Sequence, residues 1–228
     1  IPQFKEVLAK YDLKLVGINQ HIGSLFMDGK PYVEGVKAIL NIAKQFEDLE
    51  FVDLGGGFGI PYEKLNDQPR LDMVELGKQL DEVFEQFVKD YGKEITFKIE
   101  PGRYVSAECG VLLGTVTAVK HNGEDKYIGT DIGFNVLQRP VMYDSHHDIE
   151  VYNDSDNTED VTVVGNICES GDILAKHRIC PEMHVGDTMA MLDAGAYGYC
   201  MASNYNNRLR PAEVLIRENN DVVLIRER

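Results

Sequence analysis

The chain has 228 residues, a net charge of -15, and an ordinary composition in which 43% of the residues are hydrophobic. This length can bury one large core or two smaller ones. The negative charge opposes contact with nucleic-acid phosphates. The longest apolar stretch, residues 110–119, is about half of what spans a bilayer. We therefore expect no nucleic-acid or membrane partner. Four scattered cysteines without a CxxC pair favour free thiols and a cytoplasmic setting.

The first hundred residues alternate between strand-like and helical patterns. Short β-type runs occur at 13–18, 51–54 and 95–99. Helical stripes of apolar residues lie between them, and a further helix is expected at 2–10. This order predicts a parallel sheet with right-handed crossovers. The first stripe holds Val36, Leu40, Ala43 and Phe46, and the second holds Leu76, Leu80, Phe84, Phe87 and Tyr91.

After about residue 105 the pattern changes to short strands separated by turns rich in Gly, Asn or Asp, which is typical of antiparallel β-structure. We predict an α/β domain at 1–105 and an antiparallel all-β domain at 106–228. The last two strands are expected to form a hairpin across 218–221. The predicted strands are 111–119, 126–130, 161–167, 188–192, 213–216 and 222–225.

Two of the predicted parallel strands end at residues suited to binding a ligand, and ligands of such sheets lie at the carboxyl ends of strands. His21 and Ser24 follow the first strand. The imidazole can stack on an aromatic ring and the hydroxyl can donate to a phosphate, although a lone histidine is more often structural. Gly55, Gly56 and Gly57 follow the second strand. Their N–H groups can enclose an anion, or the turn simply needs glycine.

The third strand ends at Glu100, Pro101, Gly102 and Arg103. A carboxylate there can face a pyridine nitrogen, and the guanidinium can bind phosphate or carboxylate. Alone, this segment would be interpreted as a surface ion pair. Together, the three strand ends supply a ring-stacking residue, a phosphate-binding loop and a pyridinium partner, which are the parts of a pyridoxal 5'-phosphate (PLP) site.

With these motifs the sequence resembles the fold-type III PLP-dependent decarboxylases over essentially its whole length. The resemblance implies the last three strands of a PLP-binding (β/α)8 barrel (a TIM barrel), followed by an all-β C-terminal domain. The glutamate after Cys168 indicates the diaminopimelate decarboxylase branch, since ornithine-type relatives usually have aspartate there. The matching motifs are His21-Ile22-Gly23-Ser24, Gly55-Gly56-Gly57-Phe58-Gly59, Glu100-Pro101-Gly102-Arg103, Asp131-Ile132-Gly133-Phe134-Asn135, Arg139-Pro140-Val141-Met142-Tyr143, Cys168-Glu169-Ser170-Gly171-Asp172 and Ala194-Gly195-Ala196-Tyr197-Gly198.

The resemblance implies decarboxylation of meso-2,6-diaminopimelate to L-lysine and CO2, the last step of lysine biosynthesis, by a homodimer with shared active sites. Cys168 would be the catalytic proton donor, and with Glu169 it would cross to the partner's cofactor. The implied cofactor-binding residues are His21, Ser24, Gly55, Gly56, Gly57, Glu100, Pro101, Gly102, Arg103 and Tyr197. The implied substrate-binding residues are Arg103, Arg139, Tyr143, Glu169 and Tyr197.

The resemblance places the lysine that holds the cofactor on the first barrel strand, well before His21. We expect this chain to lack that lysine and to be inactive alone, as part of a longer protein or, alternatively, as a natural fragment that another chain completes. The alternatives are a fold-type III decarboxylase acting on ornithine, arginine or carboxynorspermidine, a catalytically dead regulatory homologue, or a simple phosphate-binding module.

Two other features are interpreted as structural. Lys120 lies in a short stretch similar to the cofactor-lysine motif, but it follows the Glu-Pro-Gly-Arg segment and is expected to be an ordinary β-domain residue. The spacing of His146, His147, Cys180 and His184 fits no standard zinc arrangement. We expect hydrogen-bonded or exposed histidines and no metal.

Overall fold

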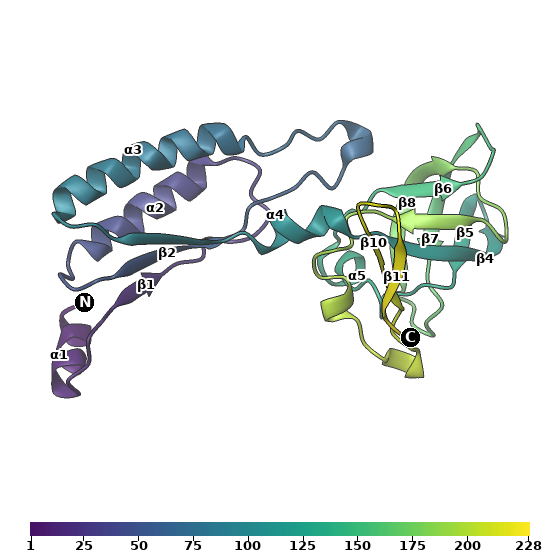
Figure 1. Ribbon diagram of the computed structural model, residues 1–228. Helices are drawn as coiled ribbons and strands as arrows, with labels where there is room; N and C mark the ends of the chain where they lie inside the picture. Colours follow the sequence, from purple (N-terminus) through teal and green to yellow (C-terminus); the bar gives the residue numbers. More distant parts are fainter. The chain divides into compact units, whose positions relative to one another are not determined.

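The computed structural model describes all residues 1–228, and the chain divides into two compact units (Figure 1). One unit comprises Ile1–Pro61 and Pro69–Tyr104, and the other comprises Tyr62–Gln68 and Val105–Arg228. A short segment that follows the glycine-rich loop therefore belongs to the C-terminal unit. No helix combines the length and the apolar character that crossing a membrane requires. Each unit is described by itself.

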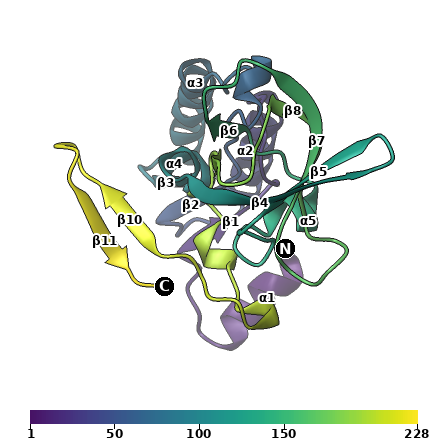
Figure 2. The ribbon, with the colours of Figure 1, turned by 90° about the vertical axis from the view of Figure 1, so that its right-hand side faces the viewer.

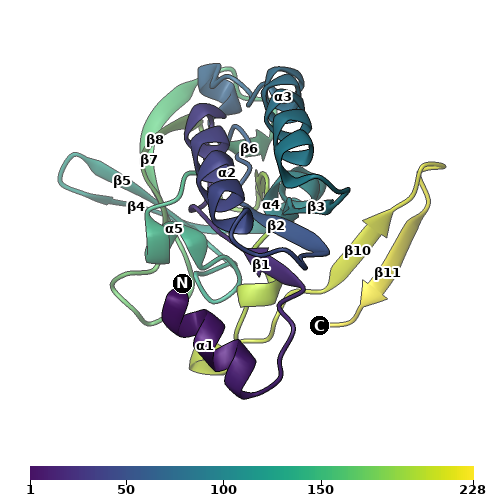
Figure 3. The same ribbon diagram turned by 90° about the vertical axis from the view of Figure 1, so that its left-hand side faces the viewer.

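The first unit is a parallel sheet of three strands in the order β1 (Gly17–Asn19), β2 (Phe51–Gly56) and β3 (Thr96–Glu100). Two helices, α2 (Lys30–Ala43) and α3 (Met73–Tyr91), lie side by side on one face of this sheet (Figures 1 and 3). The predicted parallel sheet is confirmed. β1 is shorter than the predicted strand at 13–18, because only Gly17 and Ile18 of that range, together with Asn19, pair with β2.

The ends of α3 follow directly from its sequence. The Asp72 carboxylate accepts a hydrogen bond from the Glu75 N–H at 2.9 Å, which caps the first turn. The helix ends at Gly92, whose φ of 78° is the left-handed conformation that favours glycine. The apolar face of α3 then packs on the sheet, where Phe84 stacks on Phe97 with 4.1 Å between ring centroids.

The core of the first unit lies between these helices and β2. Val36, Leu40 and Ala43 of α2 are buried, as the predicted stripe requires. The helix α1 (Pro2–Lys10) buries no residue, and its Phe4 ring forms a T-shaped contact with the Phe46 ring. The remaining short helices of the chain are η1 (Lys64–Asn66), α4 (Gly102–Ser106), η2 (Ala107–Cys109), α5 (Arg139–Tyr143), η3 (Tyr199–Met201) and η4 (Tyr205–Asn207).

The second unit is built on a six-stranded sheet whose two edge strands also approach each other, so that the sheet nearly closes. Its core is formed by apolar residues from all six strands. A separate antiparallel hairpin, β10 (Glu213–Ile216) and β11 (Val222–Arg226), extends away from this sheet (Figures 2 and 3). The sheet order is β6 (Ile149–Tyr152), β9 (Thr188–Met191), β4 (Leu112–Asn122), β5 (Asp125–Thr130), β7 (Thr158–Val164) and β8 (Ile173–Pro181).

The predicted hairpin and the all-β character of this part of the chain are confirmed. The purely antiparallel arrangement is wrong, because β5 pairs with β7 in parallel. The 27 residues between these two strands carry β6 and α5 rather than a tight turn, and this long connection lets β7 run in the same direction as β5. The strands β6 and β8 and the helix α5 were not predicted.

Candidate active site

The glycine-rich loop at the end of β2 is enclosed by backbone on two sides. A Cβ atom on Gly56 would collide with the carbonyl oxygen of Glu100. Gly55 and Gly57 have φ angles of 71° and 100°, and a Cβ atom on either would collide with the backbone of residues 20–23. These positions therefore accept only glycine. The close approach brings the carboxyl ends of all three parallel strands into contact.

Ser24 and Arg103 meet at this same edge of the sheet. Arg103 Nη2 donates a hydrogen bond to Ser24 Oγ at 3.0 Å, joining the loop after β1 to the first turn of α4. Leu25, the next residue, has a φ of 64°, which is uncommon for a branched side chain. Such strain is maintained only where surrounding contacts determine the conformation. The loop is therefore held in a defined shape.

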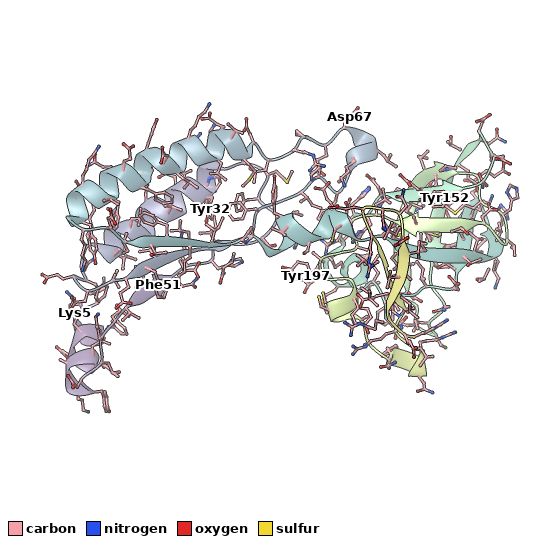
Figure 4. All side chains as sticks on the ribbon, in the orientation of Figure 1. Lys5, Tyr32, Phe51, Asp67, Tyr152 and Tyr197 are labelled. Atoms are coloured by element: carbon pink, nitrogen blue, oxygen red, sulfur yellow. The ribbon has the colours of Figure 1, made fainter.

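The aromatic rings of Phe26, Tyr32 and Phe58 pack together next to these loops. The centroid of Tyr32 lies 5.0 Å from those of both Phe26 and Phe58. Tyr32 lies between α2 and the sheet (Figure 4), and its hydroxyl donates to the Gly55 carbonyl at 3.5 Å. Burial raises the pKa of Tyr32, and the nearby carboxylates of Asp53 and Glu100 raise it further. The hydroxyl therefore stays protonated and remains a donor to the loop.

The residue types at this edge fit PLP. A hydroxyl, a guanidinium and a glycine-rich backbone suit a phosphate dianion. His21 and Glu100 are both exposed, and they offer a flat ring for stacking and an acceptor for a protonated ring nitrogen. The structure thus brings together the first-unit residues that the sequence predicted.

In the second unit, Cys168 and Glu169 are exposed on the turn between β7 and β8. The buried Asp172 carboxylate holds this turn by accepting hydrogen bonds from the N–H groups of Ile167 at 2.8 Å and Phe134 at 2.7 Å. Burial raises the pKa of Asp172, while the two N–H donors act in the opposite direction. Asp172 is therefore a structural anchor of the turn that carries the predicted catalytic cysteine.

The predicted substrate ligand Arg139 is only 2% exposed. Its Nη1 lies 2.8 Å from His147 Nε2, and its guanidinium lies over the Tyr62 ring, 4.4 Å from the centroid. His147 Nδ1 lies 2.7 Å from the Leu192 carbonyl oxygen, which can only accept. His147 is therefore protonated on Nδ1, and its Nε2 accepts from Arg139. Tyr143, at the other end of α5, is exposed.

The helix α5 lies beside the turn that carries Cys168. It packs against β8, and an added Cβ on Gly171 would come within 3.9 Å of Val141 Cγ1. The two predicted motifs, residues 139–143 and residues 168–172, therefore approach each other at Val141 and Gly171.

Tyr197 occupies a strained turn. Its φ of 60° is left-handed, and the turn is anchored by hydrogen bonds from Ala194 N to Gly110 O at 2.7 Å and from Gly195 N to Ala107 O at 3.0 Å. A bulky residue in this conformation is a frequent mark of a functional position.

Sequence reasoning missed the partners that hold these residues. His147 and Tyr62 hold Arg139 in place. Lys64, two residues after Tyr62, forms ion pairs through its Nζ with Asp193 at 2.5 Å and with Glu108 at 2.8 Å. A buried arginine requires hydrogen-bond partners, so His147, which lies close to Arg139 in the sequence, could have been suspected as a partner. The segment that contains Tyr62 and Lys64 has no sequence motif that would have indicated its role.

The chain belongs to the pyridoxal-dependent decarboxylase family. The family profile described as "Pyridoxal-dependent decarboxylase, C-terminal sheet domain" matches residues 15–195. The chain is 40% identical over 221 residues to a diaminopimelate decarboxylase of Methanothermobacter thermautotrophicus, covering 93% of this chain and 51% of that protein. It is 44% identical over 208 residues to one from Archaeoglobus fulgidus, covering 88% of this chain and 48% of that protein.

Solved structures agree with the sequence comparison. The crystal structure of the M. jannaschii diaminopimelate decarboxylase in complex with L-lysine matches with a TM-score of 0.89 and 34% identity, over 99% of this chain and 52% of that one. The Helicobacter pylori enzyme with L-lysine matches with a TM-score of 0.85 and 32% identity, over 98% of this chain and 56% of that one. The predicted family and fold class are confirmed. The chain spans about half the length of the relatives it matches.

Proposed function

We propose that the protein containing this chain is a PLP-dependent carboxy-lyase that converts meso-2,6-diaminopimelate to L-lysine and CO2. The observation that carries this proposal is the meeting of three strand ends, with the predicted PLP ligands on them, in a chain whose relatives are named diaminopimelate decarboxylases. The relatives' complexes with L-lysine support an amino-acid substrate or product.

The first unit is proposed to hold the cofactor. The glycine-rich loop, Ser24 and Arg103 would bind the phosphate, with Tyr197 of the second unit assisting. His21 would stack on the pyridine ring, and Glu100 would accept a hydrogen bond from its protonated nitrogen. When bound, PLP supplies an electron sink for the electron pair released as carbon dioxide leaves. The protein's task is to orient that ring and keep its nitrogen protonated.

The second unit is proposed to recognise the substrate. Meso-diaminopimelate carries an amino group and a carboxylate at its distal end, and Glu169 and Arg139 have the complementary charges. Tyr143 would add a hydroxyl. Arg139 is preorganised by His147, so its guanidinium loses little freedom on binding. Cys168, which is exposed, would deliver a proton to the α-carbon of the substrate after carbon dioxide has left.

Two copies of the protein are proposed to share each site, with Cys168 and Glu169 reaching the cofactor of the partner. Their exposure within one copy supports this arrangement. It predicts that two inactive variants, Cys168→Ala and Gly56→Ala, regain about a quarter of wild-type activity when mixed after subunit exchange. Mixtures that stay inactive, although heterodimers form, would count against shared sites.

The experiment that tests the proposed function is a substrate panel on the full-length native protein with PLP. L-lysine formation from meso-diaminopimelate is expected, with ornithine and arginine turned over at least about a hundredfold more slowly because they lack the distal carboxylate. Equal or better turnover of ornithine or arginine would favour another decarboxylase of the family. No turnover of any substrate would favour a non-catalytic homologue.

A further inference from the structure

Tyr205 contacts the predicted substrate ligand Glu169 from a distant part of the second unit. Its hydroxyl donates a hydrogen bond to Glu169 Oε2 at 3.3 Å, across 36 positions of sequence. We propose that Tyr205 is a positioning residue that sets the orientation of the Glu169 carboxylate for the distal amino group of the substrate. This inference rests on the proposed function, because Glu169 has a substrate amino group to bind only if the protein is the proposed decarboxylase.

The Tyr205 ring is fixed by contacts that lead back to the same turn. It lies against Phe134, with 5.2 Å between the ring centroids. The Phe134 N–H donates to Asp172, and Asp172 anchors the turn on which Glu169 lies. The hydroxyl and the carboxylate it contacts are therefore attached to one connected framework.

The segment that carries Tyr205 is itself tied down. The Ser203 N–H donates to the Asn135 carbonyl oxygen at 2.8 Å, and Arg208 Nη2 donates to the Asn166 carbonyl oxygen at 2.9 Å. Between these anchors, Asn206 has a φ of 51° and lies in the left-handed region. Asparagine tolerates this conformation better than most residues. The η4 turn thus presents Tyr205 in one defined place.

A tyrosine hydroxyl suits this role chemically. It is a neutral donor, so it occupies one carboxylate oxygen of Glu169 and leaves the charge available to a substrate ammonium group. The other carboxylate oxygen of Glu169, Oε1, is then restricted to a narrow range of orientations. The expected consequence is tighter substrate binding, with little effect on the chemical step.

The test is Tyr205→Phe in the full-length native protein with PLP, because phenylalanine keeps the ring on Phe134 and removes only the hydroxyl. We expect KM for meso-diaminopimelate to rise about three- to tenfold, with kcat changed less than about twofold. The matched control is Tyr152→Phe, which removes another tyrosine–glutamate bond, Tyr152 to Glu150 at 3.1 Å on β6 (Tyr152 is labelled in Figure 4). It should leave both constants unchanged.

A double variant separates positioning from a general structural effect. In a Glu169→Gln background, Tyr205→Phe should raise KM by less than about twofold further, because the partner it orients has lost its charge. Unchanged KM in Tyr205→Phe alone, or a full additional rise in the double variant, would overturn the positioning role while leaving the proposed function intact. Absence of any turnover by the wild-type protein would overturn the proposed function, and this inference with it.

Discussion

Arg103 donates a hydrogen bond to Ser24 across 79 positions of sequence, with 3.0 Å between Nη2 and Oγ. The pair joins the loop after β1 to the helix turn after β3, and the glycine-rich loop after β2 contacts the strand ends on both sides of it. Two motifs that each looked ordinary in isolation are therefore parts of one sheet edge.

Replacing Arg103 by lysine should weaken PLP binding. Lysine keeps the charge but loses the planar, multidentate donor that reaches Ser24, so we expect the Kd for PLP to rise about tenfold. Titration of the cofactor-free native protein with PLP, followed by fluorescence, measures this. The control is Arg217→Lys at an exposed position of the β10–β11 hairpin. An Arg103→Lys protein with wild-type affinity would remove the arginine from the cofactor site.

Replacing Gly56 and Gly77 by alanine should change the free energy of unfolding in opposite directions. A Cβ at Gly56 meets the Glu100 carbonyl oxygen, whereas a Cβ at Gly77, inside α3, meets nothing within 4 Å. We expect Gly56→Ala to lower the free energy of unfolding by about 1–3 kcal/mol and Gly77→Ala to raise it by about 0.5–1 kcal/mol. Chemical denaturation of the native protein measures both. Similar values for the two variants would contradict the enclosed loop.

His147 should be required to hold Arg139 in place. His147→Leu removes an acceptor from a buried guanidinium and a donor from the Leu192 carbonyl oxygen, so we expect a loss of about 2–4 kcal/mol of stability. His147→Gln retains both functions in one side chain and should lose about half as much. Thermal unfolding of both variants provides the comparison. Equal losses would show that packing, rather than hydrogen bonding, is what His147 contributes.

Cys180 should make stability depend on alkaline pH. Burial raises the pKa of Cys180 from an ordinary 9.0 to about 11. The folded state therefore binds the thiol proton more tightly, so stability is retained below pH 9 and falls between pH 9 and 11, by about 2–3 kcal/mol. Comparing denaturation curves of the wild type and Cys180→Ala isolates this contribution. If the stability difference between them stays constant from pH 8 to 11, the thiol does not titrate as described.

The periodic elements of this chain are the ones that sequence predicts well. The stripes of α2 and α3 are long and one-sided; Val36, Leu40, Ala43, Leu76 and Phe87 are buried, and the remaining stripe residues are partly buried against the same core. The site motifs were also visible, because glycine runs and a Glu-Pro-Gly-Arg segment are unusual at strand ends. The contact between these motifs depends on how closely the backbone segments approach each other, as Gly56 approaches Glu100. A sequence pattern does not predict such distances.

The missed elements lack a local signal. β8 carries Lys176, His177 and Arg178 in its middle, so its apolar pattern is interrupted, and as an edge strand it is paired only with β7 in the sheet. Tyr205 lies in a polar stretch that contains no recognisable motif. Its role depends on a contact with Glu169 that only the fold creates.

The most direct test of the proposed decarboxylase is the rate at which the native protein, supplied with PLP, forms L-lysine from meso-diaminopimelate when Cys168 is replaced by alanine. Loss of the proton donor should lower kcat by about a hundredfold or more, whereas Cys200→Ala, at another exposed cysteine, should keep the wild-type rate. A Cys168→Ala protein that forms L-lysine as fast as the wild type would contradict the account.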